Sequence, residues 1–223
     1  MPPQEPNSLS NQAFASPWPH RKRLAIEFTL VFLGIPLLIL ALKIQILMFI
    51  ALWAGGIAAY YFCRRQNLQS SHWRSGIASV LRRFACFAPL IVVLSWYLAP
   101  HLFLALPRQQ PLLWLAVMVL YPALSVWPQE IIYRRLIYHR YQPLFGQGAG
   151  YIAVSAITFG YAHLIMINWL AIAMTTAGGY IFASDYAARR SLILVCLEHA
   201  LYGCLIFTVG LGRYFYTGSV WHH

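Results

Sequence analysis

The chain of 223 residues carries only five acidic side chains, so each one is a candidate for chemistry. They are Glu5, Glu27, Glu130, Asp185 and Glu198. Four of them lie in or beside long apolar runs, where an ionisable side chain is costly to bury and needs a reason. Glu27 and Asp185 lie near the ends of such runs, each four residues from an arginine, so an ion pair at the membrane surface explains them.

Glu130 lies deeper and forms a different pattern. Glu130 and Arg134 are four residues apart and share a helical face, so we expect an ion pair that keeps the carboxylate charged. His163 and His199 lie inside two further apolar runs. A lone histidine there is more often a hydrogen-bonding group. Together with a glutamate, two histidines can polarise a water molecule, either as a general base or as metal ligands.

Long apolar segments must position these residues. The chain is 60% hydrophobic and only 9% charged, whereas soluble domains carry about 25% charged residues. The apolar runs are 24–42, 44–63, 84–106, 111–127, 149–167, 169–187 and 191–211. Since a membrane span needs about 20 apolar residues and an isolated strand cannot satisfy its backbone in lipid, we predict an all-α polytopic membrane protein with about seven transmembrane helices around a polar cavity.

The fourth run raises a question of depth. If its helix ends at 127, Glu130 lies at the membrane surface, away from the histidines. If the helix continues to about residue 136, Glu130 lies roughly 9 Å inside the membrane edge. Only the second arrangement lets Glu130, His163 and His199 meet in one cavity.

The basic residues predict the orientation. With the N-terminus in the cytoplasm, only Lys43, Arg108 and Arg213 face outside, and the other basic residues face inside, as the positive-inside rule requires. The net charge of +11 therefore reflects topology, not nucleic-acid binding. Lipid is the expected surroundings, and a bacterial inner membrane is the expected location.

The chain divides into four expected parts. Residues 1–20 are polar and proline-rich and predict a disordered cytoplasmic tail. Residues 21–110 predict scaffold helices, 111–212 a catalytic core, and 213–223 a short polar tail.

Three short motifs on separate predicted helices carry a resemblance. Gln129, Glu130 and Arg134 align with EExxxR, Phe159 and His163 with FxxxH, and His199 and Gly203 with HxxxN. In this order they resemble the CPBP family of intramembrane proteases, which includes the type II CAAX prenyl endopeptidases and the bacterial Abi proteins. The resemblance covers residues 111–212. It implies a water-filled cavity and hydrolysis of a peptide bond in a membrane-associated protein or peptide.

The resemblance also implies roles. Glu130, His163 and His199 would be catalytic, with Gln129, Arg134 and Phe159 supporting them. Since the family is described with both metal and glutamate mechanisms, two options stay open: a divalent metal such as zinc held by Glu130, His163 and His199, or no metal, with Glu130 and His163 activating water and His199 stabilising the oxyanion.

Two departures from the family pattern leave alternatives. Gln129 stands where the family has a glutamate, and an amide cannot accept a proton at neutral pH. Gly203 stands where an asparagine would donate to an oxyanion. The chain is therefore either a CAAX-processing-like endopeptidase or a catalytically idle binding or immunity protein on the same scaffold. A proton-coupled transporter is a third reading, although the chain has no inverted repeat.

Overall fold

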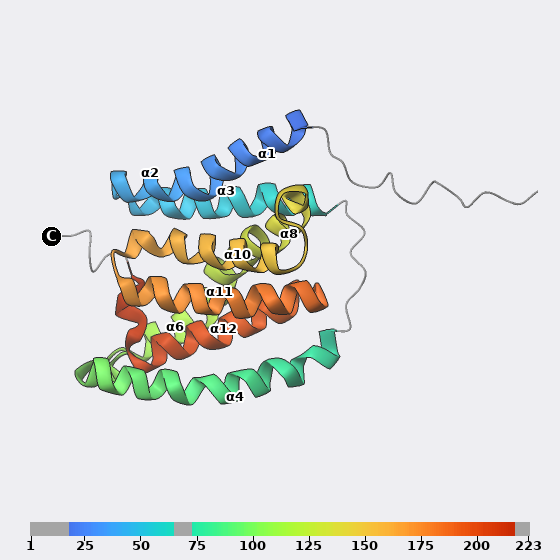
Figure 1. Ribbon diagram of the computed structural model, residues 1–223. Coiled ribbons are helices and arrows are strands. Elements are labelled where there is room, and N and C mark those ends of the chain that lie inside the picture. The colour runs from blue at the N-terminus through green and yellow to red at the C-terminus, as the bar shows by residue number, and fades with distance from the viewer. Residues whose placement is uncertain (1–17, 65–72, 217–223) are drawn as a thin grey trace, which may run out of the picture.

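The computed structural model describes residues 18–64 and 73–216 of the chain. Within these ranges every regular element is helical and no strand occurs, which confirms the all-α prediction. The long helices lie side by side as a bundle, with α1–α3 at one edge and α4 at the other (Figure 1). The predicted tails fall largely on residues 1–17 and 217–223, which lie outside the described residues.

The elements follow one another in this order, where η marks π-helical or 3₁₀ turns: α1 Trp18–Thr29, η2 Leu30–Gly34, α2 Ile35–Leu42, α3 Gln45–Cys63, α4 Trp73–Leu98, η3 Pro100–Leu102, α5 Ala105–Gln109, α6 Pro111–Tyr121, η4 Pro122–Val126, α7 Trp127–Glu130, η5 Ile131–Leu136, α8 Ile137–Arg140, α9 Gln142–Phe145, α10 Ala149–Ala162, η6 His163–Met166, α11 Trp169–Arg189, α12 Leu192–Val209 and η7 Leu211–Phe215.

Six helical stretches of the described residues are long and apolar enough to cross a membrane. They are His20–Leu42, Gln45–Cys63, Gly76–Leu98, Pro111–Arg140, Ala149–Met166 and Leu192–Val209. The seventh predicted span corresponds to α11, which is 21 residues long but less apolar, because polar residues such as Thr175, Thr176 and Asp185 interrupt it. The fold is that of a polytopic helical membrane protein, and α11 lies among its long helices (Figure 1).

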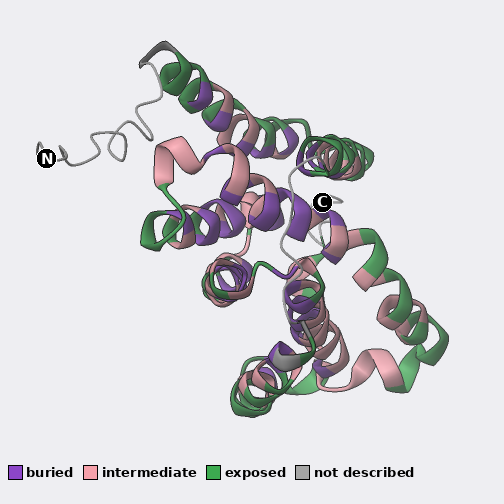
Figure 2. Cartoon of the chain, turned by 90° about the vertical axis from the view of Figure 1, so that its right-hand side faces the viewer, coloured by how far each residue is buried: buried purple, intermediate pink, exposed green. Residues whose placement is uncertain are grey.

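The surface of the bundle is apolar. Figure 2 shows exposed residues on the outer sides of the helices and buried residues on the sides that face one another. Leu112 and Tyr97, for example, are 82% and 80% exposed. An apolar exterior of this extent suits contact with lipid tails.

The first two spans form a tight hairpin, as a single residue between their apolar runs requires. Lys43 adopts a left-handed backbone conformation (φ 53°) between α2 and α3 and reverses the chain.

The first helix, α1, already begins at Trp18, inside the predicted N-terminal tail. The apolar pattern indicates where lipid contact begins, whereas a helix can start earlier in polar surroundings.

Glu27 has a different partner from the one expected. Arg140 of α8 binds both carboxylate oxygens of Glu27 at 2.5 Å, and the Tyr141 hydroxyl donates to the same carboxylate at 2.8 Å. The expected pairing with Arg23 is therefore secondary. Because the bundle brings α8 against α1, the two-pronged Arg140 contact is available and is geometrically stronger.

The fourth span does not end at 127. The helix runs without a break from Pro111 to Arg140, so Glu130 lies well inside it. Two π-helical segments, Pro122–Val126 and Ile131–Leu136, flank the α-helical turn Trp127–Glu130. Proline lacks an N–H and normally breaks a helix, but a π-helical turn can absorb the missing hydrogen bond. This explains how Pro122 and Pro128 are accommodated.

Small residues set the closest helix contact near the predicted site. A Cβ atom added at Gly179 of α11 would lie 3.0 Å from Ala156 Cα of α10, and one added at Gly160 would clash with Thr176 Oγ1. Such close approach through small residues is typical of membrane helices. It places α10, which ends at His163, firmly against α11.

A buried charge cluster attaches α4 to the bundle. Arg83 of α4 binds both oxygens of Glu198 at 2.8 Å and Asp185 Oδ1 at 2.5 Å, while Arg189 also pairs with Asp185. The Asp185 and Glu198 side chains are almost fully buried. The predicted Asp185–Arg189 pair is thus present, and Arg83 extends it across three helices.

Candidate active site

Gln129 and Glu130 are neighbours in the chain, but only Gln129 faces the cavity. Gln129 lines a cavity of about 360 Å³, whereas Glu130 is completely buried and does not line it. Successive residues on a helix point about 100° apart, and the flanking π-helical turns adjust that direction further. The residue that faces the cavity is therefore an amide, and the carboxylate lies behind it.

Glu130 makes two charged contacts. Its Oε1 accepts from His199 Nδ1 at 2.8 Å, and its Oε2 lies 3.0 Å from Arg134 Nε. The second contact is an ion pair whose angle departs from that of a hydrogen bond. The predicted Glu130–Arg134 pair is therefore present, and both carboxylate oxygens are engaged.

Arg134 lies between the Glu130 carboxylate and the ring of Phe159. Its guanidinium is fully buried, donates from Nη1 to Ser155 Oγ at 3.0 Å, and lies 4.5 Å above the Phe159 ring. A buried cation needs both a counter-charge and further partners. Glu130 and the Phe159 ring supply them.

His199 is held from three sides. Nδ1 faces Glu130, Nε2 lies 3.1 Å from the Tyr121 hydroxyl, and the imidazole stacks on the Phe182 ring at 4.9 Å. A carboxylate on Nδ1 fixes that nitrogen as an N–H donor and orients the ring. When the ring is neutral, Nε2 then accepts a hydrogen bond from the Tyr121 hydroxyl.

Tyr121 is a site residue that the sequence analysis missed. It lies on α6 and belongs to no motif. A Cβ atom added at Gly203 would lie 2.6 Å from Tyr121 Cζ and would also clash with the hydroxyl oxygen. The glycine at the position of the family's asparagine therefore makes room for a phenol. The only signal in the sequence was the absence of a side chain at Gly203.

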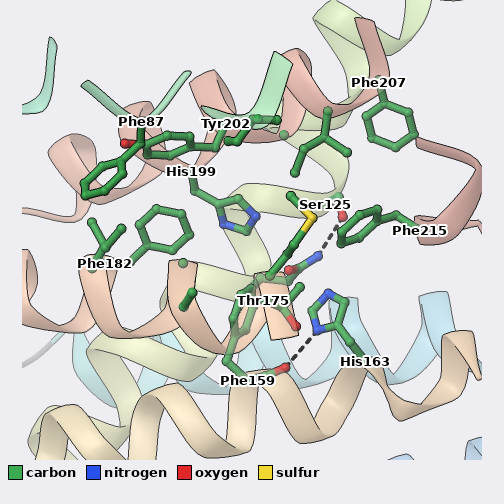
Figure 3. Close-up of a pocket in the computed structure, with 18 of the residues that line it drawn as sticks. Phe87, Ser125, Phe159, His163, Thr175, Phe182, His199, Tyr202, Phe207 and Phe215 are labelled. Atoms are coloured by element: carbon green, nitrogen blue, oxygen red, sulfur yellow. Dashed lines mark hydrogen bonds between the residues drawn. The ribbon is translucent and has the colours of Figure 1, made fainter. Parts of the chain in front are cut away.

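His163 marks the end of α10. Its Nδ1 donates to the carbonyl oxygen of Phe159 at 2.8 Å, a contact drawn in Figure 3. This contact assigns the proton to Nδ1 and leaves the lone pair on Nε2. Since His163 lines the cavity, this nitrogen is available to a molecule inside it.

Phe159 lies between the two histidines. Its ring centroid is 4.9 Å from that of His163 and 5.6 Å from that of His199. Phe159 also carries Arg134 on its ring. One aromatic residue thus spaces both imidazoles and shields the buried ion pair from the cavity.

The cavity itself is mainly apolar. Figure 3 shows aromatic side chains around the two imidazoles. Its polar lining side chains are Tyr121, Ser125, Gln129, His163, Thr175, His199 and Tyr202, and no described Asp, Glu, Lys or Arg lines it. Helix α4, expected to be scaffold, contributes Phe87, Leu90, Ile91 and Leu94 to the wall.

The expected metal ligands do not fit a metal. Among the described residues, no three His, Cys, Asp or Glu side chains gather as an ion would require. Glu130 and His199 contact each other, and His163 does not complete the set. Glu130, His163 and His199 therefore do not form the predicted three-ligand group in this structure.

The expected role of Glu130 also changes. Glu130 was expected to activate water directly, yet it is buried behind Gln129 with both oxygens engaged. His163 and His199 share the cavity wall with Gln129, and Glu130 touches only His199 among them. Glu130 is thus placed to orient His199.

The segment that contains these residues matches a known protein family. Residues 108–205 match the model of the family described as type II CAAX prenyl endopeptidase Rce1-like. The match includes all three motifs and confirms the family resemblance that they predicted. Comparisons with curated proteins and with solved structures gave no match.

Proposed function

Because residues 108–205 match a family of membrane-embedded endopeptidases, we propose that this protein hydrolyses a peptide bond of a membrane-associated protein or peptide inside the cavity. The observation that carries the proposal is the pair of imidazoles on one apolar wall, with a buried carboxylate behind one of them. An apolar cavity strengthens every polar interaction made inside it.

His163 is the proposed general base. Its Nε2 lone pair removes a proton from a water molecule as the water oxygen attacks the carbonyl carbon of the peptide bond. The tetrahedral intermediate then collapses, the C–N bond breaks, and the proton moves from His163 to the leaving nitrogen. The products are a carboxylic acid, which keeps the second proton of the water, and an amine.

Gln129 is proposed to hold the peptide bond. Its Nε2 donates to Ser125 Oγ at 2.7 Å, while its Oε1 is buried without a hydrogen-bond partner. A buried acceptor of this kind is costly to leave unsatisfied. The N–H of the bond to be cleaved supplies the missing donor and aligns the carbonyl with the water.

Tyr121 and His199 are proposed to stabilise the oxyanion. When Nε2 of His199 carries a proton, it donates to the Tyr121 oxygen and leaves the phenol O–H free to donate to the developing charge. Glu130 accepts from Nδ1 of His199 and fixes the orientation of the ring, and Arg134 pairs with Glu130. Glu130 and Arg134 are positioning residues in this scheme.

The experiment uses the purified full-length protein in liposomes with peptides that carry apolar segments, and mass spectrometry detects cleavage. His163→Ala is expected to lower turnover at least about 100-fold, the low end for loss of a general base. His101→Ala, at an exposed residue outside the cavity, is the matched control. Cleavage that is unchanged in His163→Ala would overturn the mechanism.

A second function, binding without cleavage, is favoured by one observation. The residue that faces the cavity at the family's glutamate position is Gln129, which cannot take up a proton. In this reading the site holds a membrane segment and releases it intact. Gln129→Glu separates the two: proteolysis that appears only in this variant supports binding alone, whereas wild-type proteolysis supports the enzyme.

The expected setting is part of the proposal. The distribution of basic residues supports an N-terminus in the cytoplasm, and we propose a bacterial inner membrane as the location. Tagging the N-terminus and testing its accessibility from each side of sealed vesicles would check the orientation.

A further inference from the structure

A second cavity meets the first one at the polar side chains. It has a volume of about 520 Å³ and lies between α2, α3, α6 and η6. The first cavity, of about 360 Å³, lies between α4, α11 and α12. Each has the size of a typical ligand site. The residues that line both cavities are Tyr121, Ser125, Gln129, His163, Met166, Phe207 and Phe215.

The shared wall contains three of the residues given a role in the proposed reaction, namely Tyr121, Gln129 and His163, whereas His199 lines the first cavity alone. A linear molecule with one end in each cavity would lie against Gln129 and His163 at its middle. Outside this wall, apolar side chains dominate both linings, for example Leu94 and Ile181 on one side and Met48 and Leu120 on the other. The arrangement suits a polar group at the centre and apolar groups at both ends.

The two cavities lack permanently charged side chains in their linings. Among the described residues, no Asp, Glu, Lys or Arg lines either cavity. Burial of a chain-terminal carboxylate or a charged side chain there would cost several kcal/mol without a partner. A substrate cut close to its own C-terminus would bring such a carboxylate into one of the cavities, whereas a bond inside an apolar segment would not.

Gln129 indicates that the occupant carries amide groups. Its unpartnered Oε1 requires a hydrogen-bond donor, and if the amide were assigned the other way round, its NH₂ would require an acceptor. A peptide backbone provides both. A hydrocarbon chain provides neither, so a lipid alone leaves this atom unsatisfied.

We propose that the two cavities bind the two flanks of one uncharged apolar polypeptide segment, with its central peptide bond at Gln129. The substrate class is thus a transmembrane-type segment cut internally, not a chain trimmed near its charged end. This inference rests on the proposed function for the cutting step, but binding of the segment does not depend on it.

The test measures binding by photocrosslinking to the full-length protein in liposomes. The probe is a peptide of about 20 apolar residues, blocked at both ends, with one photoreactive leucine on either flank of its central bond. Two probes, one for each flank, are expected to label different cavities. Two probes that label the same cavity would overturn the proposal.

Cavity-filling variants come with controls on the same helices. Ala177→Trp fills the first cavity and Ala51→Trp the second, whereas the exposed Ala173 and Ala58 line neither. Each filling variant is expected to reduce labelling by one probe about tenfold, and Ala173→Trp and Ala58→Trp to leave it within about twofold. Equal losses in filling and control variants would contradict the proposal.

Two further probes separate the occupants. A peptide with lysine on one flank should label at least about tenfold less, and undiminished labelling would overturn the exclusion of charge. A photoreactive isoprenoid alcohol that labels the second cavity and displaces the peptide from it would assign that cavity to a lipid chain instead. Labelling as proposed without any cleavage would refute hydrolysis and leave the binding inference standing.

Discussion

The phenol of Tyr121 occupies the space that any side chain at position 203 would need. A Cβ atom at Gly203 would lie 2.6 Å from Tyr121 Cζ, and the Tyr121 hydroxyl lies 3.1 Å from His199 Nε2. A residue of one helix thus stands in for a missing side chain of another. The departure from the family motif at Gly203 therefore does not remove a hydrogen-bond donor from the site.

Removal of that donor should slow the reaction. Tyr121→Phe keeps the ring and loses the hydroxyl, so we expect kcat to fall about 100- to 1,000-fold, as for other oxyanion donors, with little change in KM. Steady-state kinetics on the liposome-embedded protein measures both constants. Tyr97→Phe, at a residue that is 80% exposed, should match wild type. Equal kcat values in Tyr121→Phe and wild type would remove Tyr121 from the mechanism.

The position of the donor should be exchangeable between the two helices. Gly203→Asn alone should abolish activity, because its Cβ clashes with Tyr121. In the double variant Tyr121→Ala/Gly203→Asn, the alanine vacates the space for the asparagine. We expect its kcat to be at least about tenfold higher than that of Tyr121→Ala alone. Thermal unfolding of each variant checks that the fold persists. No gain in the double variant would argue that the phenol serves packing only.

Loss of the Glu130 carboxylate should destabilise the fold as well as the site. Glu130→Ala leaves Arg134 charged, fully buried and without its counter-ion, so we expect a loss of about 3–5 kcal/mol in the free energy of unfolding. Denaturant titration in detergent micelles measures this. Glu27→Ala removes a pair that is 29% exposed on both sides and should cost about 1 kcal/mol or less. Similar losses in both variants would contradict the buried-charge argument.

The attachment of α4 should depend on Arg83. Arg83→Met leaves Glu198 buried without its cation and is expected to cost about 3–5 kcal/mol. The double variant Arg83→Met/Glu198→Gln should recover part of this loss, because no unpaired charge remains at position 198. The neighbouring exposed arginine provides the control, since Arg82→Met should change stability by no more than about 0.5 kcal/mol. A double variant less stable than Arg83→Met would refute the explanation.

Local patterns predicted the helices well because the length and polarity of a membrane span are properties of a short stretch of sequence. The Lys43 hairpin and the Glu130–Arg134 pair belong to this class. The end of the fourth span stayed open between residue 127 and about residue 136, because the apolar pattern stops at 127 and does not reveal the π-helical turns on either side of Pro128.

Contacts between distant segments could not be predicted in the same way. Arg83 and Glu198 are 115 residues apart, and Tyr121 and His199 are 78 apart. Nothing in either local pattern selects the partner. The motifs predicted Glu130, His163 and His199 as catalytic and Gln129 as supporting, but only the packed helices reveal that Gln129 lines the cavity and Glu130 does not.

Because Gln129 faces the cavity and Glu130 does not, contact with the bound molecule and stability of the helix packing depend on different residues. Glu130 belongs to the charged contacts between helices, whereas Gln129 lines both cavities and donates to Ser125. A single substitution at position 129 can therefore alter reactivity and leave the framework intact. Such a protein can therefore change during evolution from cleaving a membrane segment to binding it, or the reverse, without repacking its interior.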